Sequence, residues 1–401
     1  MRISTAQMFS QTTTSILQKQ TAAAKSLDQL SSGKKISSSG EDPVAALAID
    51  NLTQQQALTD QFMRNIDYAT NHLNMAESQL GNAGNLVTSM REQVLRAVNG
   101  TLASGERQMI ADELQGSLEE LLKVANTQDE SGNYLFAGFQ VESQPFAFDA
   151  AGAMVYQGDD GIRQAIVASN VGLGINIPGD MAFMKGPNGL GDYGVNYLAS
   201  QAGDFRVLSA AVTNSTTHVP DIYTFNFIDN GAGGVNLEVR DSSSALVANV
   251  NNFNASVPVA FNGIEVQLDG KPLAGDSFSM SPQSEISIFD TVTQAISLIN
   301  DDTLINSPAG KAQLAQLLNN FDSGLEQLAS ARAIAGNNLK SLENYTGRHE
   351  EEQVVNSSAL SILQDLDYAS AISEFEKQQL ALNAVSNVFG KVSSTSLFDY
   401  I

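Results

Sequence analysis

The chain has 401 residues and no cysteine, and its 21 Lys and Arg against 44 Asp and Glu give a net charge of −23. The lack of cysteine excludes disulfides, thiol catalysis and cysteine metal sites, and the negative charge disfavours binding to nucleic acid or to an anionic membrane. The opening residues MRISTAQMFS lack the apolar core of a signal peptide, and no later stretch is apolar for long enough to span a bilayer. We therefore expect no nucleic-acid or membrane partner and, for a chain that leaves the cell, export without a cleaved signal peptide.

Residues 1–42 are rich in Ser, Thr and Gln and poor in large apolar residues. Ile16, Leu27 and Leu30 can form one thin apolar stripe on a helix, but they cannot build a core of their own. We expect this segment to be disordered in the monomer and to fold on assembly.

Residues 43–140 and 286–360 are expected to be helical. Asp42 is a good N-cap and Pro43 suits the first helical position. From there an apolar spacing of three and four residues runs to residue 97, broken only by Gln55 and Thr59, as in a coiled coil. A second stripe runs through residues 110–125. After a further start signal at Ser307–Pro308, the stripe continues through Leu314, Leu317, Phe321, Leu328, Ala335 and Leu342.

Residues 141–285 differ in pattern and are expected to form an inserted β-rich domain. Tyr223, Phe225 and Phe227 alternate with polar residues, and Asn262–Gly263 separates two apolar stretches as in a two-residue hairpin. The fold class predicted for the chain is α+β: a long antiparallel, coiled-coil-like helical bundle built from both chain ends, with an antiparallel β-rich domain inserted into it.

The last segment, residues 361–401, again has one apolar stripe and nothing local to cover it. The stripe includes Ile372, Phe375, Leu382 and Phe389. Residues 1–35 are mainly basic and residues 350–401 mainly acidic, so the two chain ends complement each other in charge. We expect them to form an assembly seam in which Ile16, Leu27 and Leu30 face Ile372, Phe375, Leu382 and Phe389, partly between neighbouring subunits.

No motif indicates catalysis, a cofactor or a metal ion, and we predict that the protein is not an enzyme. HEEEQ at 349–353 lacks the second histidine of a zinc-protease helix. SSGKK at 31–35 lacks the upstream glycine of a phosphate loop, and GDDG at 158–161 lacks the alternating ligands of a calcium loop. His72, His218 and His349 are expected to be ordinary surface or core histidines.

Several stretches together resemble the flagellin superfamily: MRISTAQMF at the start, LSSGKKISSSGEDPVAA at 30–46, GNYLFAGFQVESQPF at 132–146 and SLFDYI at the end. Within it they are similar to the hook-associated protein 3 family of the hook–filament junction. GKPLAGDSFSMSP at 270–282 and DLDYASAISEFEKQQLALNA at 365–384 agree with this resemblance.

The resemblance implies a structural subunit of the bacterial flagellum, exported unfolded through the flagellar type III channel and located outside the cell. It implies a homo-oligomer whose terminal segments line the core of a tubular assembly, with a neighbouring hook-associated protein and flagellin as partners. It also implies that an export chaperone holds the C-terminal segment before export.

The resemblance places YLFAG where the helical bundle meets the β domain. We predict that Tyr134, Leu135, Phe136 and Phe139 form an interdomain clasp, with Gly132 and Gly138 permitting sharp turns; the plainer interpretation is that they are core residues of the bundle end. The domains predicted are an assembly segment at 1–42, a helical rod of 43–140 with 286–360, the β domain at 141–285 and a second assembly segment at 361–401.

Two other functions stay open from the sequence. One is a filament-forming flagellin, which would be abundant along filaments rather than confined to one end. The other is a secreted adhesin or carbohydrate-binding protein that acts through the β domain. Ligand binding by the isolated segment 141–285 would indicate this function.

Overall fold

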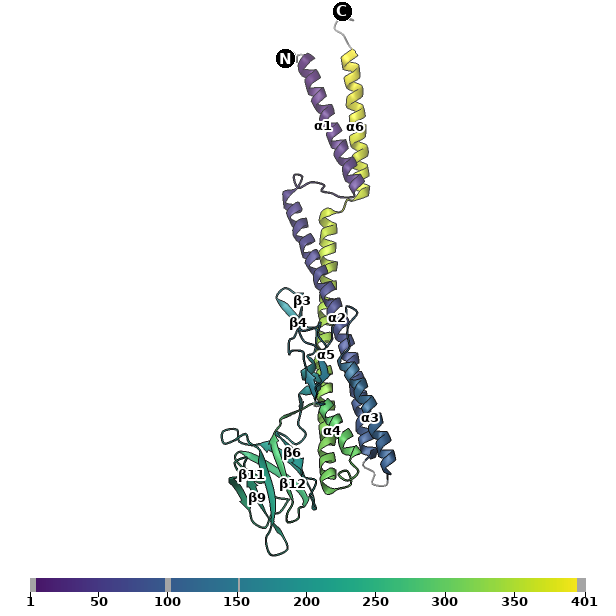
Figure 1. Cartoon of the computed structure of the whole chain (residues 1–401). Helices are drawn as coiled ribbons and strands as arrows, with labels where there is room; N and C mark the ends of the chain where they lie inside the picture. The colour runs from purple at the N-terminus through teal and green to yellow at the C-terminus, as the bar shows by residue number, and fades with distance from the viewer. Residues whose placement is uncertain (1–4, 98–101, 151, 395–401) are drawn as a thin grey trace, which may run out of the picture. The chain divides into compact units, whose positions relative to one another are not determined.

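A computed structural model of the chain describes residues 5–97, 102–150 and 152–394 (Figure 1). Contacts divide the chain into two compact units. The first unit consists of residues 1–64 and 344–401, and the second of residues 65–343. The division falls inside two long helices, α2 (Pro43–Ala97) and α5 (Pro308–Gln364), each of which contributes to both units. The boundaries predicted at 42, 140, 285 and 360 stay predictions.

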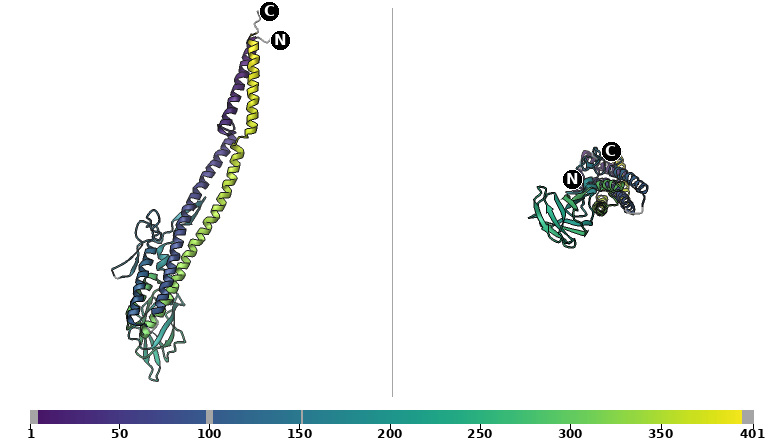
Figure 2. Two further views of the ribbon diagram at one scale, coloured as in Figure 1. Left: turned by 90° about the vertical axis from the view of Figure 1, so that its right-hand side faces the viewer. Right: turned by 60° about the horizontal axis from the view of Figure 1, so that its bottom comes forward.

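The secondary-structure elements described in the first unit are all helices. The unit contains α1 (Thr5–Ser32), α6 (Tyr368–Ser394) and the adjoining ends of α2 and α5. Helices α1 and α6 lie antiparallel against each other (Figures 1 and 2). The predicted start of α2 is confirmed, because the Asp42 carboxylate accepts hydrogen bonds from the amides of Val44 and Ala45 at 3.1 and 3.0 Å. The disorder expected of residues 1–42 in the free subunit stays a prediction.

The second unit combines a helical bundle with the β domain. Its helices are the remainder of α2 and α5 together with α3 (Ser104–Ala125) and α4 (Ile288–Asn300). The predicted apolar stripes form its core: the stripe of α2 is buried from Ile66 to Ala97, and all six predicted residues of α5 from Leu314 to Leu342 are buried. The start of α5 is confirmed too, since the Ser307 hydroxyl accepts a hydrogen bond from the Gly310 amide at 3.0 Å. No helix among the described residues is both long and apolar enough to cross a membrane.

Two antiparallel sheets form most of the β domain. One sheet has the order β10-β9-β8-β13-β6 and the other the order β11-β12-β7. In chain order these strands are β6 (Tyr193–Tyr197), β7 (Asp204–Val212), β8 (Tyr223–Asp229), β9 (Val235–Arg240), β10 (Leu246–Val250), β11 (Val259–Phe261), β12 (Ile264–Lys271) and β13 (Ser277–Pro282). The predicted hairpin joins β11 to β12, and Asn262 and Gly263 have the positive φ values of 45° and 74° that such a turn needs.

Aromatic side chains fill the space between the sheets. Tyr223, Phe225 and Phe227, which alternate in the sequence, are all buried, and the rings of Phe225 and Phe278 stack with centroids 4.4 Å apart. Their burial follows from strand geometry, in which every second side chain points to the same face. The predicted α+β class is confirmed.

Shorter elements connect the sheets to the bundle. They are the pairs β1–β2 (Phe146–Phe148, Met154–Tyr156), β3–β4 (Gln164–Ala168, Val171–Gly174) and β5–β14 (Gly186–Pro187, Glu285–Ile286), and the π-helix η1 (Asp180–Met184). The β3–β4 hairpin is hydrogen-bonded to both long helices. The Asn65 amide group donates to the Ile166 carbonyl at 2.7 Å, and that of Asn338 donates to the Gly174 carbonyl at 3.0 Å.

Candidate functional site

The predicted seam residues lie on α1 and α6, which contact each other within the first unit. Ile16 and Leu30 of α1 are half-buried, as are Phe375, Leu382 and Phe389 of α6. Leu27 and Ile372 are more exposed to solvent, at 57% and 47%. The structure thus brings the two helices together, but it buries none of the seven side chains fully.

One member of this surface was missed by the sequence reasoning. The ring of Phe9 lies 5.0 Å from that of Phe389, centroid to centroid, near the ends of α1 and α6. Phe9 is nevertheless 55% exposed. Its spacing of seven residues before Ile16 was the signal that could have found it.

Many other large apolar side chains of the first unit are exposed to solvent. Four of them are open by 70% or more: Val44, Val354, Ile362 and Leu380. The rest are Leu17, Leu47, Leu58, Val355, Tyr368 and Val388, each more than half exposed. Exposed apolar side chains that gather into one patch are typical of protein-association sites.

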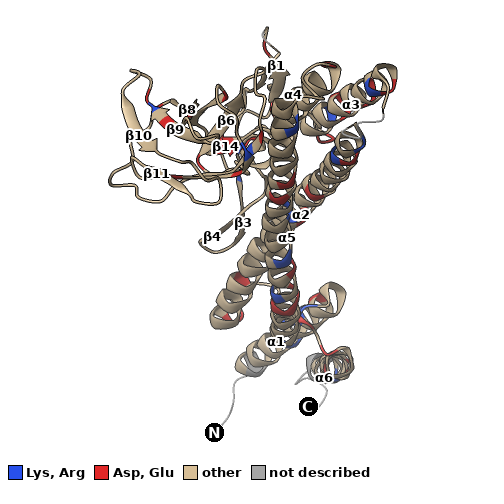
Figure 3. Cartoon of the chain, turned by 90° about the horizontal axis from the view of Figure 1, so that it is seen from below, with Lys and Arg blue, Asp and Glu red and all other residues tan. Residues whose placement is uncertain are grey.

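The described charges of the first unit also make contacts within one chain end. Lys25 forms an ion pair with Glu41 at 3.1 Å, within the N-terminal part. Lys19 does contact α6, but through the uncharged oxygen of Gln378, 3.4 Å from its ammonium group. Figure 3 shows basic and acidic positions interspersed along α5. Exposed ion pairs of this kind contribute little to stability, so apolar contact is the main force available to the unit.

The aromatic stretch after α3 is placed where the bundle meets the β domain. Leu135 and Phe136 are completely buried. The Phe136 ring meets Phe183 of η1 edge-on at 5.4 Å, and Phe183 in turn lies 5.8 Å from Phe289 of α4. Phe136 therefore joins a cluster that is built from several elements of the second unit.

The other two members of the predicted clasp lie differently. Tyr134 is half-buried, and its amide donates to the Val141 carbonyl at 2.8 Å. Phe139 is 62% exposed, outside the aromatic cluster, and its ring covers Gly161. The structure therefore brings Leu135 and Phe136 into the core and leaves Phe139 at the surface.

The glycines of this stretch have the backbone that was expected of them. Gly132 and Gly138 have φ values of 83° and 71°, which favour glycine. A Cβ atom at Gly138 would lie 2.3 Å from the Asp159 carbonyl oxygen. The Asp159 carboxylate accepts hydrogen bonds from the Phe139 and Gly161 amides at 2.8 and 2.9 Å, so GDDG forms a turn.

The histidines are held by protein contacts. His72 is buried, with Nε2 2.8 Å from the guanidinium of Arg163, and burial followed by the charge of Arg163 lowers the pKa of His72. His218 lies 2.8 Å from the Tyr193 hydroxyl, and Nδ1 of His349 lies 3.3 Å from Glu352. Among the described residues, no group of three or more potential ligands could hold a metal ion.

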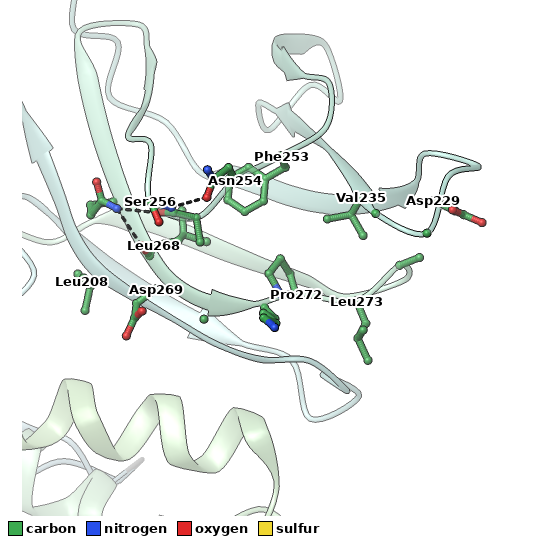
Figure 4. A pocket seen from close by; sticks show the side chains of 17 residues that line it. Leu208, Asp229, Val235, Phe253, Asn254, Ser256, Leu268, Asp269, Pro272 and Leu273 are labelled. Atoms are coloured by element: carbon green, nitrogen blue, oxygen red, sulfur yellow. Dashed lines mark hydrogen bonds between the residues drawn. The ribbon is translucent and has the colours of Figure 1, made fainter.

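A groove of about 990 Å³ opens between the loops of the two sheets (Figure 4). Phe253, Leu268 and Leu273 contribute its apolar lining. Its polar groups largely bond to the protein: Gln267 donates to the carbonyls of Ala255 and Leu268 at 2.7 and 2.9 Å. The groove has no arrangement of groups that specifies a chemistry.

Comparisons with known proteins point to the flagellum. A model of the bacterial flagellin N-terminal helical region matches residues 3–141. Flagellar hook-associated protein 3 of Escherichia coli strain K12 is 32% identical over 228 residues, covering 55% of this chain and 68% of that protein. Flagellin B of Vibrio anguillarum is 23% identical over 380 residues, covering 92% of this chain and 91% of that protein. Identity is therefore higher to the hook-associated protein than to this flagellin.

A solved structure gives the same indication. The flagellar junction protein FlgL of Legionella pneumophila is 30% identical and superposes with a TM-score of 0.68. The match covers 79% of this chain and 100% of that chain. The likeness thus extends over the whole of the solved protein.

Proposed function

The chain belongs to the flagellar hook-associated protein 3 family, and we propose on that basis that it forms the junction between the hook and the filament of a bacterial flagellum. It is a structural component of the flagellum. The observation that carries the proposal is the 30% identity and full coverage of a solved flagellar junction protein. The exposed apolar surface of the terminal helices supports it, because a subunit that is completed by its neighbours needs such a surface.

The gene deletion is the direct test. Cells that lack the protein should carry hooks without filaments and should shed flagellin into the medium, because the filament has no base on which to grow. Reintroducing the full chain should restore filaments. Normal filaments in the deletion strain would contradict the junction proposal.

We propose further that the protein acts as a homo-oligomer through its terminal helices. Ile16, Leu27 and Leu30 would form the seam with Ile372, Phe375, Leu382 and Phe389. The side chains that stay half-exposed in a single chain would then be covered by neighbouring copies, by a second hook-associated protein on one side and by flagellin on the other. The burial of apolar surface is the driving force, at about 25 cal/mol per Å².

Export requires that this apolar surface be covered before assembly. We propose that a flagellar export chaperone binds the segment 361–401 and that the chain leaves the cell through the flagellar export channel. Leu380, which is 75% exposed on α6, is the kind of anchor that such a partner would cover. Binding of the purified chaperone to the full chain, lost on removal of residues 360–401, is the expected result; binding that survives the removal would exclude this site.

The clasp proposal concerns the second unit. We propose that Leu135 and Phe136 fix the β domain to the bundle through the aromatic cluster with Phe183 and Phe289, that Tyr134 assists through its backbone, and that Phe139 covers the GDDG turn. The β domain would then act as an outer, spacing element. Loss of export and assembly on clean removal of residues 141–285 would contradict a purely spacing role.

A further inference from the structure

The two segments that link the terminal helices α1 and α6 to the long helices are hydrogen-bonded to each other at one point. Residues 33–42 join α1 to α2, and residues 365–367 join α5 to α6. The Lys35 amide donates to the Gln364 carbonyl at 2.7 Å, and the Leu366 amide donates to the Gly33 carbonyl at 3.0 Å. Lys34 and Asp365 face each other as an antiparallel bridge. We name this pairing of residues 33–35 with 364–366 the linker bridge.

Gly33 occupies the centre of the linker bridge for two physical reasons. Its φ of 71° places it in the left-handed region, where it ends α1 as a C-cap while its amide still bonds the Gln29 carbonyl at 2.9 Å. A Cβ atom at this position would lie 2.8 Å from the hydroxyl oxygen of Tyr368. Both the backbone and the space therefore favour glycine.

The side chain of Gln29 completes the turn. Its amide nitrogen donates to the Lys35 carbonyl at 2.7 Å. The last turn of α1 is thereby hydrogen-bonded to the segment that pairs with residue 364. This arrangement explains SSGKK at 31–35, which is not a phosphate loop. Its glycine turns the chain, and its two lysines take part in the bridge through their backbone.

The contacts farther along α1 and α6 have the register that the bridge sets. Lys19 meets Gln378 and Phe9 meets Phe389, and Gly33 is bonded to Leu366. These three pairs have nearly the same sum of residue numbers, as one continuous antiparallel register requires. The register is thus the same from the bridge to the far end of the helix pair.

We propose that Gly33 is a positioning residue: through the linker bridge it pairs α1 with α6 of the same chain in one register. The inference concerns pairing inside one chain and goes beyond the junction role. Its alternative is an exchanged arrangement, in which α1 of one copy pairs with α6 of another. Under the proposal, the apolar side chains that remain exposed, such as Leu27 and Ile372, are left for neighbouring copies.

The test uses the natural absence of cysteine from the chain. The purified full-length protein carries Lys19→Cys and Gln378→Cys, two positions that lie in contact across the pair, and is treated at high dilution with a short bismaleimide. Intrachain and interchain products are separated on a denaturing gel. Because the link is irreversible, it accumulates paired chains even when residues 1–42 are mostly unfolded before assembly.

The parent chain should give mainly the intrachain product. Gly33→Ala should slow intrachain linking roughly tenfold, since a side chain in the left-handed region is disfavoured by about this factor and the added Cβ also displaces the Tyr368 hydroxyl. Gly40→Ala is the matched control. Gly40 lies in the same connection, its φ is not positive, and an added Cβ would have only Ser38 Oγ nearby, at 3.9 Å.

Two further variants separate the effect of the left-handed backbone at Gly33 from that of the displaced Tyr368 hydroxyl. Gly33→Asn should recover part of the rate, because Asn tolerates the left-handed region. Tyr368→Phe in the Gly33→Ala chain should recover another part, because it removes the displaced hydroxyl. Equal intrachain rates for the parent and Gly33→Ala, or mainly interchain product from the parent, would overturn the proposal. Neither result depends on whether the protein is found in flagella, so the junction role is tested separately.

Discussion

The two units of this chain are built from the same long helices but are stabilised in different ways. Every buried apolar residue in the described part of the chain lies between Ile66 and Leu342, in the second unit. In the first unit, the buried side chains are polar: Thr59, His349 and Asn356. The second unit therefore has its own core, whereas the described apolar residues of the first unit are half-buried or exposed.

Along α5, the buried residues change from apolar to polar without a break in their heptad spacing. On α5 the buried positions Leu328, Ala335 and Leu342 are followed, at the same spacing of seven residues, by His349 and Asn356. The heptad pattern thus continues into the first unit while its chemistry changes from apolar to polar. Periodicity sets which face is turned inward, and residue type sets how much stability that face contributes.

The largest expected effect comes from the seam. Phe375→Ser combined with Leu382→Ser should abolish incorporation into flagella, because it removes apolar surface that neighbouring copies would cover. The melting temperature of the purified chain should stay unchanged, because neither residue belongs to the core. Incorporation is measured by immunolabelling of detached flagella, and melting by circular dichroism.

The matched control for the seam replaces Leu246 and Val257 by Ser. These side chains are 49% and 59% exposed in the β domain, so apolar area is lost away from the terminal helices. This control should still be incorporated. A large drop in melting temperature for the seam variant would show that the first unit contributes to the monomer core, and the contrast between the units would fail.

Inside the second unit, Phe136→Ala should reduce the free energy of unfolding by about 3–5 kcal/mol, the usual loss for a large aromatic in a packed core. Phe139→Ala, three residues away and 62% exposed, should change it by less than about 0.5 kcal/mol. Denaturant unfolding of both variants measures the difference. Similar values for the two would contradict the division of this aromatic stretch into core and surface.

Replacing a buried polar residue of the first unit by an apolar one should stabilise the chain, whereas Phe136→Ala destabilises it. The side-chain nitrogen of Asn356 is buried and has no hydrogen-bond partner among the described residues. Asn356→Leu should therefore stabilise the helix ends by about 1 kcal/mol, seen as slower proteolysis within residues 344–364. Ser361→Leu, at an exposed position of the same helix, is the control and should have little effect. Faster proteolysis of Asn356→Leu would show that the amide is structurally required.

The smallest effect is a pH dependence in the second unit. Burial and the charge of Arg163 lower the pKa of His72, so the folded state binds fewer protons than the unfolded state, in which the pKa is about 6.5. The stability contributed by neutral His72 is therefore present above about pH 6.5 and is lost as the pH falls below it. His72→Gln, which can still accept from Arg163, should flatten the fall in unfolding free energy between pH 7 and pH 5. An unchanged slope would exclude His72, and His218→Gln serves as the comparison.

The sequence predicted the helices and the hairpin well because their signals are local. The cap at Asp42, the stripe on α5 and the turn at Asn262–Gly263 each depend on a few neighbouring residues. The sequence could not show that Phe139 lies at the surface, since that depends on Asp159 and Gly161, which are distant along the chain. The linker bridge was missed for the same reason: it pairs residues about 330 positions apart through the backbone, and backbone pairing leaves little trace in residue type.

Backbone hydrogen exchange on the purified full-length chain tests the contrast between the two units most directly. We predict that amides of α2 and α5 within residues 65–343 exchange orders of magnitude more slowly than amides of the same helices within residues 43–64 and 344–364, because only the former are covered by a core. Equal protection along the whole length of both helices would contradict the account, since the first unit would then be stable without its neighbours.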